Sequence, residues 1–306
     1  MRARPRRCAR RKGDGVTQLL GAIEAGGTKW VLGTGQADGT IAARHVIPTR
    51  DPGTTLAEAR DWLAGQGTLA AIGIGSFGPV ELDRSRGAYG SITSTPKPGW
   101  RNTPVVPFFA GAFGVPIGFD TDVNAAALGE HEMGAGAGAA GCAYVTVGTG
   151  IGGGIVIGGR TVAGAGHPEV GHAFPRRGKE DFGFAGQCPY HGDCYEGLAS
   201  GPAIQSRWGA TLSDLPPDHE AHDLVAGYLA QLCHTIFATA AVEVIVLGGG
   251  VLGTPGLRER VAERTAALNA GYLPGGDRQR IVAPGLGDHS GLTGALLLAA
   301  RALSRA

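Results

Sequence analysis

Two cysteines and one histidine stand close together in the second half of the chain. They form the pattern Cys188-x-x-His191-x-x-Cys194. Thiolate sulfur and imidazole nitrogen are preferred ligands of Zn²⁺, and this spacing lets one loop place three ligands around a tetrahedral ion. A fourth ligand must come from another segment. Because a set of four protein ligands leaves no open position for water, the pattern predicts a structural zinc site.

Two glycine-rich turns, about half a chain apart, each lie between two predicted strands. The first covers 25–29 and the second covers 148–154. Backbone N–H groups in such turns can bind an anion without interference from side chains, so the pair indicates a polyphosphate held between two domains. The second turn also matches G-x-G-x-x-G, but it leads into another strand instead of a helix, which argues against a dinucleotide-binding fold. The sequence contains no Walker motif.

Five motifs, in order along the chain, resemble the ROK family of sugar kinases and repressors. They cover 24–29, 94–100, 148–154, 167–172 and 188–194. The segments 94–100 and 188–194 are similar to the bacterial fructokinase branch, and the resemblance runs from about Leu20 to the C-terminus. It implies an α/β fold of the actin-like (ribonuclease H-like) type, with two domains and a cleft between them. Repressor members carry a helix-turn-helix domain before this body, and the residues before the first predicted strand are too few to form one.

Asp122 is the candidate general base, because transfer of a phosphoryl group to a sugar needs a group that accepts the hydroxyl proton. It follows the apolar run 115–119 and precedes the helix-forming segment 123–128. The carboxylate is therefore expected at a helix N-terminus, where the helix dipole favours its ionised form. A plain N-cap role would place an aspartate at the same point. In the family the aligned aspartate is the base; Thr121 replaces the usual preceding asparagine, and Asp120 is a weaker candidate.

The resemblance assigns the remaining ligand contacts. The phosphates of ATP would lie against Gly26, Gly27, Thr28, Lys29, Thr149 and Gly150, and the nucleoside would lie beside Gly248, Gly249 and Gly250. Mg²⁺ would accompany ATP, with Glu24 standing where many relatives have aspartate. The sugar would contact Gly78, Thr121, Asp122, Glu169, His172 and Glu196. His172 would also be the fourth zinc ligand, with His167 as the alternative.

Short apolar runs predict the strands that position these residues, at 19–24, 30–33, 70–75, 115–119, 143–147, 155–157 and 244–247. A helix is predicted over 257–269. We expect three parts: a basic, disordered tail at 1–17, an N-terminal actin-like domain at 18–120, and a C-terminal actin-like domain at 121–306 that carries the zinc loop. The last helix could pack back on the N-terminal domain.

The composition is that of a globular protein, with 306 residues, 43% hydrophobic residues and a formal net charge of +1. No apolar run has the length of a signal peptide or a membrane span. Five cysteines in a chain of this size do not form a disulfide framework, which favours a reducing cytoplasm. The basic tail could bind nucleic acid, yet neither a nucleic-acid nor a membrane partner is expected. The resemblance implies a homodimer.

These features predict an ATP-dependent fructokinase that transfers the γ-phosphate of ATP to O6 of fructose. One alternative is a kinase of the same family whose acceptor is glucose, mannose or an N-acetylhexosamine. A more distant alternative is a non-catalytic sugar sensor or regulator, which would use the basic tail to bind DNA with salt-sensitive affinity.

Overall fold

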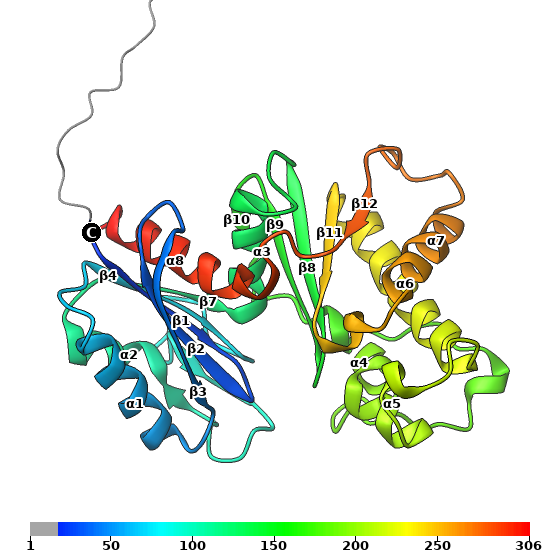
Figure 1. The fold of residues 1–306 in the computed structure, drawn as a ribbon, viewed down its shortest axis with the longest axis horizontal. Helices are drawn as coiled ribbons and strands as arrows, with labels where there is room; N and C mark the ends of the chain where they lie inside the picture. The colour runs from blue at the N-terminus through cyan, green and yellow to red at the C-terminus, as the bar shows by residue number, and fades with distance from the viewer. Residues whose placement is uncertain (1–17) are drawn as a thin grey trace, which may run out of the picture.

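The computed structural model describes residues 18–306, so the predicted disordered tail at 1–17 lies outside the described residues. Two five-stranded sheets form the two halves of the molecule, and helices cover them (Figure 1). Within the described residues, no helix is long and apolar enough to cross a membrane.

The first sheet has the strand order β3-β2-β1-β4-β7. Strands β1, β2 and β3 are antiparallel, whereas β4 and β7 run parallel to β1. The strands are β1 Leu20–Ala25, β2 Lys29–Gly35, β3 Ile41–Pro48, β4 Ala71–Ser76 and β7 Ile117–Thr121. A separate small ladder pairs β5 (Ser91–Ile92) with β6 (Thr103–Pro104).

The second sheet repeats this pattern with the order β10-β9-β8-β11-β12. Strands β8, β9 and β10 are antiparallel, and β11 and β12 run parallel to β8. The strands are β8 Gly141–Val147, β9 Ile151–Ile157, β10 Arg160–Thr161, β11 Val244–Gly248 and β12 Arg280–Val282. Each half therefore begins with an antiparallel hairpin whose turn holds one of the glycine motifs.

The helices differ between the halves. The first half has α1 (Pro52–Ala64) and α2 (Val105–Phe113), and the second has α4 (Tyr195–Ala199), α5 (Gly201–Trp208), α6 (Glu220–Ala240) and α7 (Leu257–Asn269). Short 3₁₀ helices cover Val170–His172, Lys179–Asp181, Leu212–Asp214, Gly250–Gly253 and Gly287–His289. Helix α6 is the centre of the second apolar core, which it forms with α4, α7 and the adjacent face of the sheet.

Two helices each follow a strand of one sheet but pack against the other sheet. Helix α3 (Asp122–Met133) follows β7 of the first sheet but packs against β8 and β9 of the second. Helix α8 (Ser290–Leu303) follows β12 of the second sheet but packs against β1, β4 and β7 of the first. The two helices also pack against each other, in the middle of the molecule (Figure 1). The predicted domain boundary between 120 and 121 thus falls at the end of β7, one residue before α3.

Glycines make these close helix contacts possible. A Cβ atom on Gly294 of α8 would overlap the backbone of α3 at Ala125, and one on Gly129 of α3 would overlap Ser290. Glycines of β4 and β7 approach the α8 backbone in the same way. The chain has 55 glycines in 306 residues. Some of them therefore serve close packing between helices and strands, and not turns.

An aromatic cluster in the first half fixes the proline-rich segment that borders the site. Trp30, Trp100 and Phe109 are fully buried, and the ring centroids of Trp30 and Trp100 lie 5.6 Å apart. The Trp100 Nε1–H donates to the Arg50 carbonyl oxygen at 2.8 Å. Trp100 thereby anchors the segment 94–100 from one end.

The strands predicted from apolar runs are confirmed in both sheets, and α7 begins and ends where the helix was predicted. The second glycine turn is shorter than predicted, because β9 begins at Ile151. Gly154 lies within that strand, where a Cβ atom would overlap the backbone of Val123 in α3. Position 154 thus requires glycine because α3 lies directly on the strand.

Candidate active site

A cleft with a volume of about 980 Å³ is lined by residues of both halves. The turns of both hairpins border it, as do the segments that follow β4 and β7 and the connection between β10 and α4. The predicted site residues that line it are Gly27, Thr28, Gly78, Thr121, Asp122, Thr149, Gly150, Glu169, His172, His191 and Glu196.

The other predicted residues are not among those that line the cleft. Gly26 and Lys29 close the first hairpin turn, where the Gly26 N–H donates to the Lys29 carbonyl at 3.0 Å. Gly248 ends β11, and Gly249 and Gly250 follow it. A Cβ atom on Gly249 would overlap the backbone of Val147 at the end of β8. Cys188 and Cys194 are buried beneath the cleft-lining His172 and His191.

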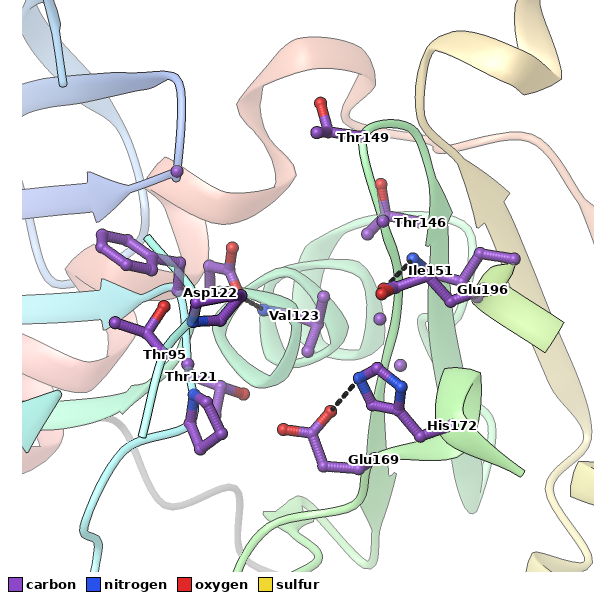
Figure 2. A pocket seen from close by; sticks show the side chains of 18 of the residues that line it. Thr95, Thr121, Asp122, Val123, Thr146, Thr149, Ile151, Glu169, His172 and Glu196 are labelled. Carbon is purple, nitrogen blue, oxygen red and sulfur yellow. Dashed lines mark hydrogen bonds and ion pairs between the residues drawn. The ribbon is translucent and has the colours of Figure 1, made fainter. Parts of the chain in front are cut away.

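Asp122 is the first residue of α3 and faces the cleft (Figure 2). The N-cap is Thr121, whose Oγ1 accepts the Asn124 N–H at 3.1 Å, so an N-cap role for Asp122 is wrong. The Asp122 Oδ1 accepts the Val123 N–H at 2.9 Å. Burial raises the pKa of Asp122 to about 6 even though this hydrogen bond lowers it, and the nearby Glu169 raises it further. The carboxylate is still mostly ionised at pH 7, but burial outweighs the helix dipole.

Asp120 is buried away from the cleft and serves the fold. Its Oδ1 accepts hydrogen bonds from Asn124 Nδ2 at 2.6 Å and from the Thr121 N–H at 2.8 Å. Its Oδ2 accepts the Thr161 hydroxyl at 2.8 Å. With these bonds Asp120 ties β7 to α3 and β10, and it is not among the residues that line the cleft.

Glu169, His172 and Glu196 face Asp122 from the second half (Figure 2). Glu169 precedes the 3₁₀ turn 170–172, which brings its Oε2 to 3.9 Å from His172 Nε2. The Glu196 Oε2 accepts the Ile151 N–H at 3.0 Å, at the start of β9. Partial burial raises the pKa of Glu169, while the neighbouring histidines lower it.

His167 lies between the two halves and is not part of the cysteine–histidine cluster. Its side chain is only 7% exposed. Its Nε2 accepts the backbone N–H of Val80, which follows β4, at 3.1 Å. The sequence offered His167 only as an alternative metal ligand, and its contact with the first half was missed.

His172, Cys188, His191 and Cys194 form one cluster whose ligand atoms all lie within 4.8 Å of one another. The two Nδ1 atoms are 3.3 Å apart, and the distances from these nitrogens to sulfur are 3.6–3.7 Å where they are in contact. A tetrahedral zinc ion with ordinary bond lengths would separate two nitrogens by about 3.3 Å and a nitrogen from a sulfur by about 3.6 Å. The four residues therefore fit Zn²⁺ in their present positions.

Residues of the segment 94–97 and Tyr190 border the same end of the cleft. The Tyr190 hydroxyl donates to the Ser94 carbonyl at 3.1 Å, which joins the cysteine–histidine loop to the first half. Thr95 and Thr146 also line the cleft (Figure 2). Sequence reasoning did not name these residues individually. Thr95 and Tyr190 lie within the motifs 94–100 and 188–194, whereas Thr146 lies in none of the five motifs.

Comparison with known proteins agrees with this architecture. The ROK family model matches residues 20–302. A fructokinase of Zymomonas mobilis is 44% identical over 290 residues, which is 92% of this chain and 96% of that protein. A fructokinase of Pediococcus pentosaceus is 40% identical over 94% of this chain and 100% of its own length.

A solved structure of a ROK hexokinase from Thermus thermophilus superposes with a TM-score of 0.76 at 28% identity, covering 95% of this chain and all of that one. This likeness confirms the predicted actin-like fold with its cleft. The predicted family is confirmed as well: the chain belongs to the ROK family.

Proposed function

We propose that this protein is an ATP-dependent fructokinase that transfers the γ-phosphate of ATP to O6 of D-fructose. The observation that carries the proposal is the half-buried carboxylate of Asp122, which faces Glu169, His172 and Glu196 across a cleft bordered by two glycine turns. The fructokinase relatives, which this chain matches over nearly its whole length, support the reaction and the choice of acceptor.

Asp122 would act as the general base. Its Oδ1 is held by the Val123 N–H, so its second carboxylate oxygen is available to the sugar hydroxyl. As the O6–H proton moves to Asp122, O6 forms a bond with the γ-phosphorus, and the bond from that phosphorus to the β–γ bridging oxygen breaks. ADP leaves with the electron pair of that bond. A positioned base of this kind contributes about 10²- to 10⁴-fold to the rate.

The two hairpin turns would hold the phosphates of ATP. Gly27 and Thr28 present the first turn to the cleft, and Thr149 and Gly150 present the second. Mg²⁺ bound with ATP would neutralise charge on the phosphate oxygens. Glu24 would face that ion, because its Oε2 is buried with no hydrogen-bond partner among the described residues. Burial also raises the pKa of Glu24 to about 7, which a nearby cation would counteract.

The sugar would lie between Asp122 and the second half. Glu169 and Glu196 would accept hydrogen bonds from its hydroxyl groups, and His172 would donate one from Nε2. The Thr121 Oγ1 already accepts a backbone N–H, but its own hydroxyl proton remains available to the sugar. Gly78, which lines the cleft in the turn after β4, would contact the sugar from the first half.

Zn²⁺ would have a structural role. Bound by His172, Cys188, His191 and Cys194, it would fix the loop that begins α4 and carries Glu196. Ligation through Nδ1 of His172 leaves the proton on Nε2, the nitrogen that faces Glu169. The ion would therefore set the donor that the sugar meets, without contact to the reacting atoms.

The proposed enzyme acts in the cytoplasm as a homodimer and needs neither nucleic acid nor a membrane. Its two domains correspond to 18–120 and 121–306, with α8 returning to the first. The sparse cysteines support a reducing compartment, since the four in the described residues form no disulfide.

A coupled assay of ADP release with Mg²⁺-ATP and a panel of free hexoses tests the proposal. We expect fructose to give the highest kcat/KM, with glucose, mannose and N-acetylhexosamines well below it. A higher kcat/KM for another hexose would retain the kinase and reject fructose as the acceptor. No ADP release with any sugar, in zinc-loaded protein, would reject the kinase and favour a sugar sensor.

A further inference from the structure

His167 connects the sugar end of the cleft to the first half of the molecule. Its ring packs against the turn after β4, where a Cβ atom on Gly78 would lie 3.4 Å from Cε1 of the ring. Val80 in that turn is buried and forms a bridge to Ile92 of β5. The ring therefore meets a firm surface of the first half, although His167 itself belongs to the second.

The hydrogen bond to Val80 determines the tautomer of the ring. Because Nε2 accepts the Val80 N–H at 3.1 Å, that nitrogen carries no proton, and the proton of the neutral ring must be on Nδ1. Nδ1 lies 3.4 Å from the Glu169 Oε1 and 3.4 Å from the Pro168 carbonyl oxygen. The N–H of His167 thus has two acceptors at the same distance, the Pro168 carbonyl oxygen to which it is hydrogen-bonded and a carboxylate that we assign to the sugar.

Glu169 consequently stands between two imidazole donors. Oε1 faces Nδ1 of His167, and Oε2 faces Nε2 of His172 at 3.9 Å. The second nitrogen of each ring is engaged elsewhere: in His167 with the Val80 N–H, and in His172 with the cysteine–histidine cluster. A carboxylate that is 41% exposed would otherwise rotate freely.

We propose that His167 is a positioning residue for sugar binding, which uses its bond to Val80 to aim Nδ1–H at Glu169 and hold that carboxylate toward the acceptor. This role rests on the proposed function of the cleft. Val80 belongs to the first half and Glu169 to the second. The Glu169 carboxylate is therefore held in place only while the two halves keep their present distance at His167.

Three substitutions of His167 distinguish the roles of its two ring nitrogens. In His167→Asn the amide can occupy the place of Nδ1 and donate to Glu169, but it does not reach Val80. In His167→Gln the longer amide can accept the Val80 N–H, yet it places no donor at the Nδ1 position. His167→Ala removes both contacts. His131→Asn is the matched control, since His131 is also buried beside a carboxylate, with Nδ1 3.5 Å from the Glu132 Oε1, but lies outside the cleft.

The readouts are the KM values for fructose and ATP, together with the melting temperature. We expect the Ala and Gln variants to raise the fructose KM about tenfold, the effect of losing a hydrogen bond to a charged group. The ATP KM should stay unchanged, and the Asn variant should recover only part of the fructose affinity, because its donor is present but is not oriented by a bond to Val80. The control should change the melting temperature alone.

Two results would overturn the positioning role. If the Gln variant recovers the fructose KM and the Asn variant does not, His167 only pins the two halves together. If all variants keep the wild-type fructose KM, Glu169 does not need His167. The proposed function fails in a different way, namely if the wild-type protein releases no ADP with fructose, so the two failures are distinguishable.

Discussion

The two sheets share one strand pattern, but the segments between their strands differ greatly. In the first half, the connection from β4 to β7 contains the small β5–β6 ladder, α2 and the proline-rich segment 94–100. In the second half, the connection from β10 to β11 contains the cysteine–histidine cluster with α4, α5 and α6, whereas the equivalent connection of the first half, from β3 to β4, contains only α1. The repeated pattern places a glycine turn at the cleft from each side.

Because of this difference, phosphate binding and sugar selection would depend on different segments of the molecule. The turns that would hold phosphate come from the repeated hairpins, and so they are nearly equivalent in the two halves. The side chains that would select the sugar, namely Glu169, His172 and Glu196, come from the long connection between β10 and β11 of the second half. The base, Asp122, comes from the first half, at the end of its last strand. The reaction thus depends on both halves, whereas the choice of acceptor depends mainly on one.

The strongest test of this division compares the N-termini of α3 and α8. Asp122 begins α3 and lines the cleft, while Asp288 stands before α8, is exposed and does not line it. Replacing Asp122 with Asn should lower kcat about 10³-fold and leave both KM values nearly unchanged, because a base is lost and the shape is kept. Asp288→Asn should retain kcat within about twofold, as expected for an exposed residue.

Steady-state kinetics and isothermal titration with a non-hydrolysable ATP analogue measure both variants. Normal turnover in Asp122→Asn would remove Asp122 from the mechanism. An equal loss of kcat in Asp288→Asn would mean that the N-termini of α3 and α8 contribute equally to turnover.

The metal cluster offers the next test, since the first half contains no comparable group of ligands among its described residues. Cys194→Ser should release the bound zinc and raise the fructose KM about tenfold to 100-fold, because the loop that carries Glu196 and orients His172 loses its support. The ATP KM should change little. Cys142→Ser is the control, because Cys142 is equally buried but belongs to β8 and not to the cluster.

Zinc content measured by emission spectrometry accompanies the kinetics. If the metal-free Cys194→Ser protein keeps the wild-type affinity for fructose, the cysteine–histidine cluster does not influence the sugar site.

The pH dependence tests the environment of the base. Burial raises the pKa of Asp122 to about 6, and only the ionised carboxylate can accept the sugar proton. We therefore expect kcat/KM for fructose, which reports the pKa of the free enzyme, to be constant above about pH 7 and to fall about tenfold per unit below about pH 6. A profile that stays flat down to about pH 4.5 would contradict a base with this pKa.

The same shift also affects stability. A folded-state pKa above the ordinary value of 3.8 means that the folded protein binds the Asp122 proton more tightly than the unfolded chain does. The resulting stabilisation is complete below about pH 3.8 and is lost as the pH rises through about 6. Asp122→Asn should therefore melt at a higher temperature than the wild type at about pH 7.5, and this difference should shrink at about pH 5.

The sequence predicted the parts of the site that depend on local spacing. Cys188, His191 and Cys194 meet because they share one loop, and Asp122 meets the cleft because a strand end and a helix start coincide there. Apolar runs bounded by glycine gave the strands of both sheets, since a buried strand needs little more than continuous apolar residues. These features require no knowledge of distant contacts.

Other features depend on partners far along the chain. The role of His167 depends on Val80, a residue 87 positions away, and no local pattern sets the orientation of its ring. Gly154 looked like part of a phosphate turn, but it is required by α3 lying on β9. The last helix, α8, could be expected to pack back on the N-terminal domain, but no pattern within its apolar sequence selects the sheet that it covers. Tertiary packing, and not local preference, decides such cases.

The finest test concerns the two glycine turns, where the halves are most alike. In the first turn a Cβ atom on Gly27 would meet nothing within 4 Å, so it would enter open space of the cleft. In the second turn a Cβ atom on Gly150 would lie 2.5 Å from the Glu196 Oε2, the atom that accepts the Ile151 N–H. Gly27→Ala should therefore raise only the ATP KM. Gly150→Ala should also raise the fructose KM, by about fivefold, the effect of losing roughly one hydrogen bond. If both variants change the ATP KM alone, the second turn holds phosphate without touching sugar selection, and the two turns are equivalent after all.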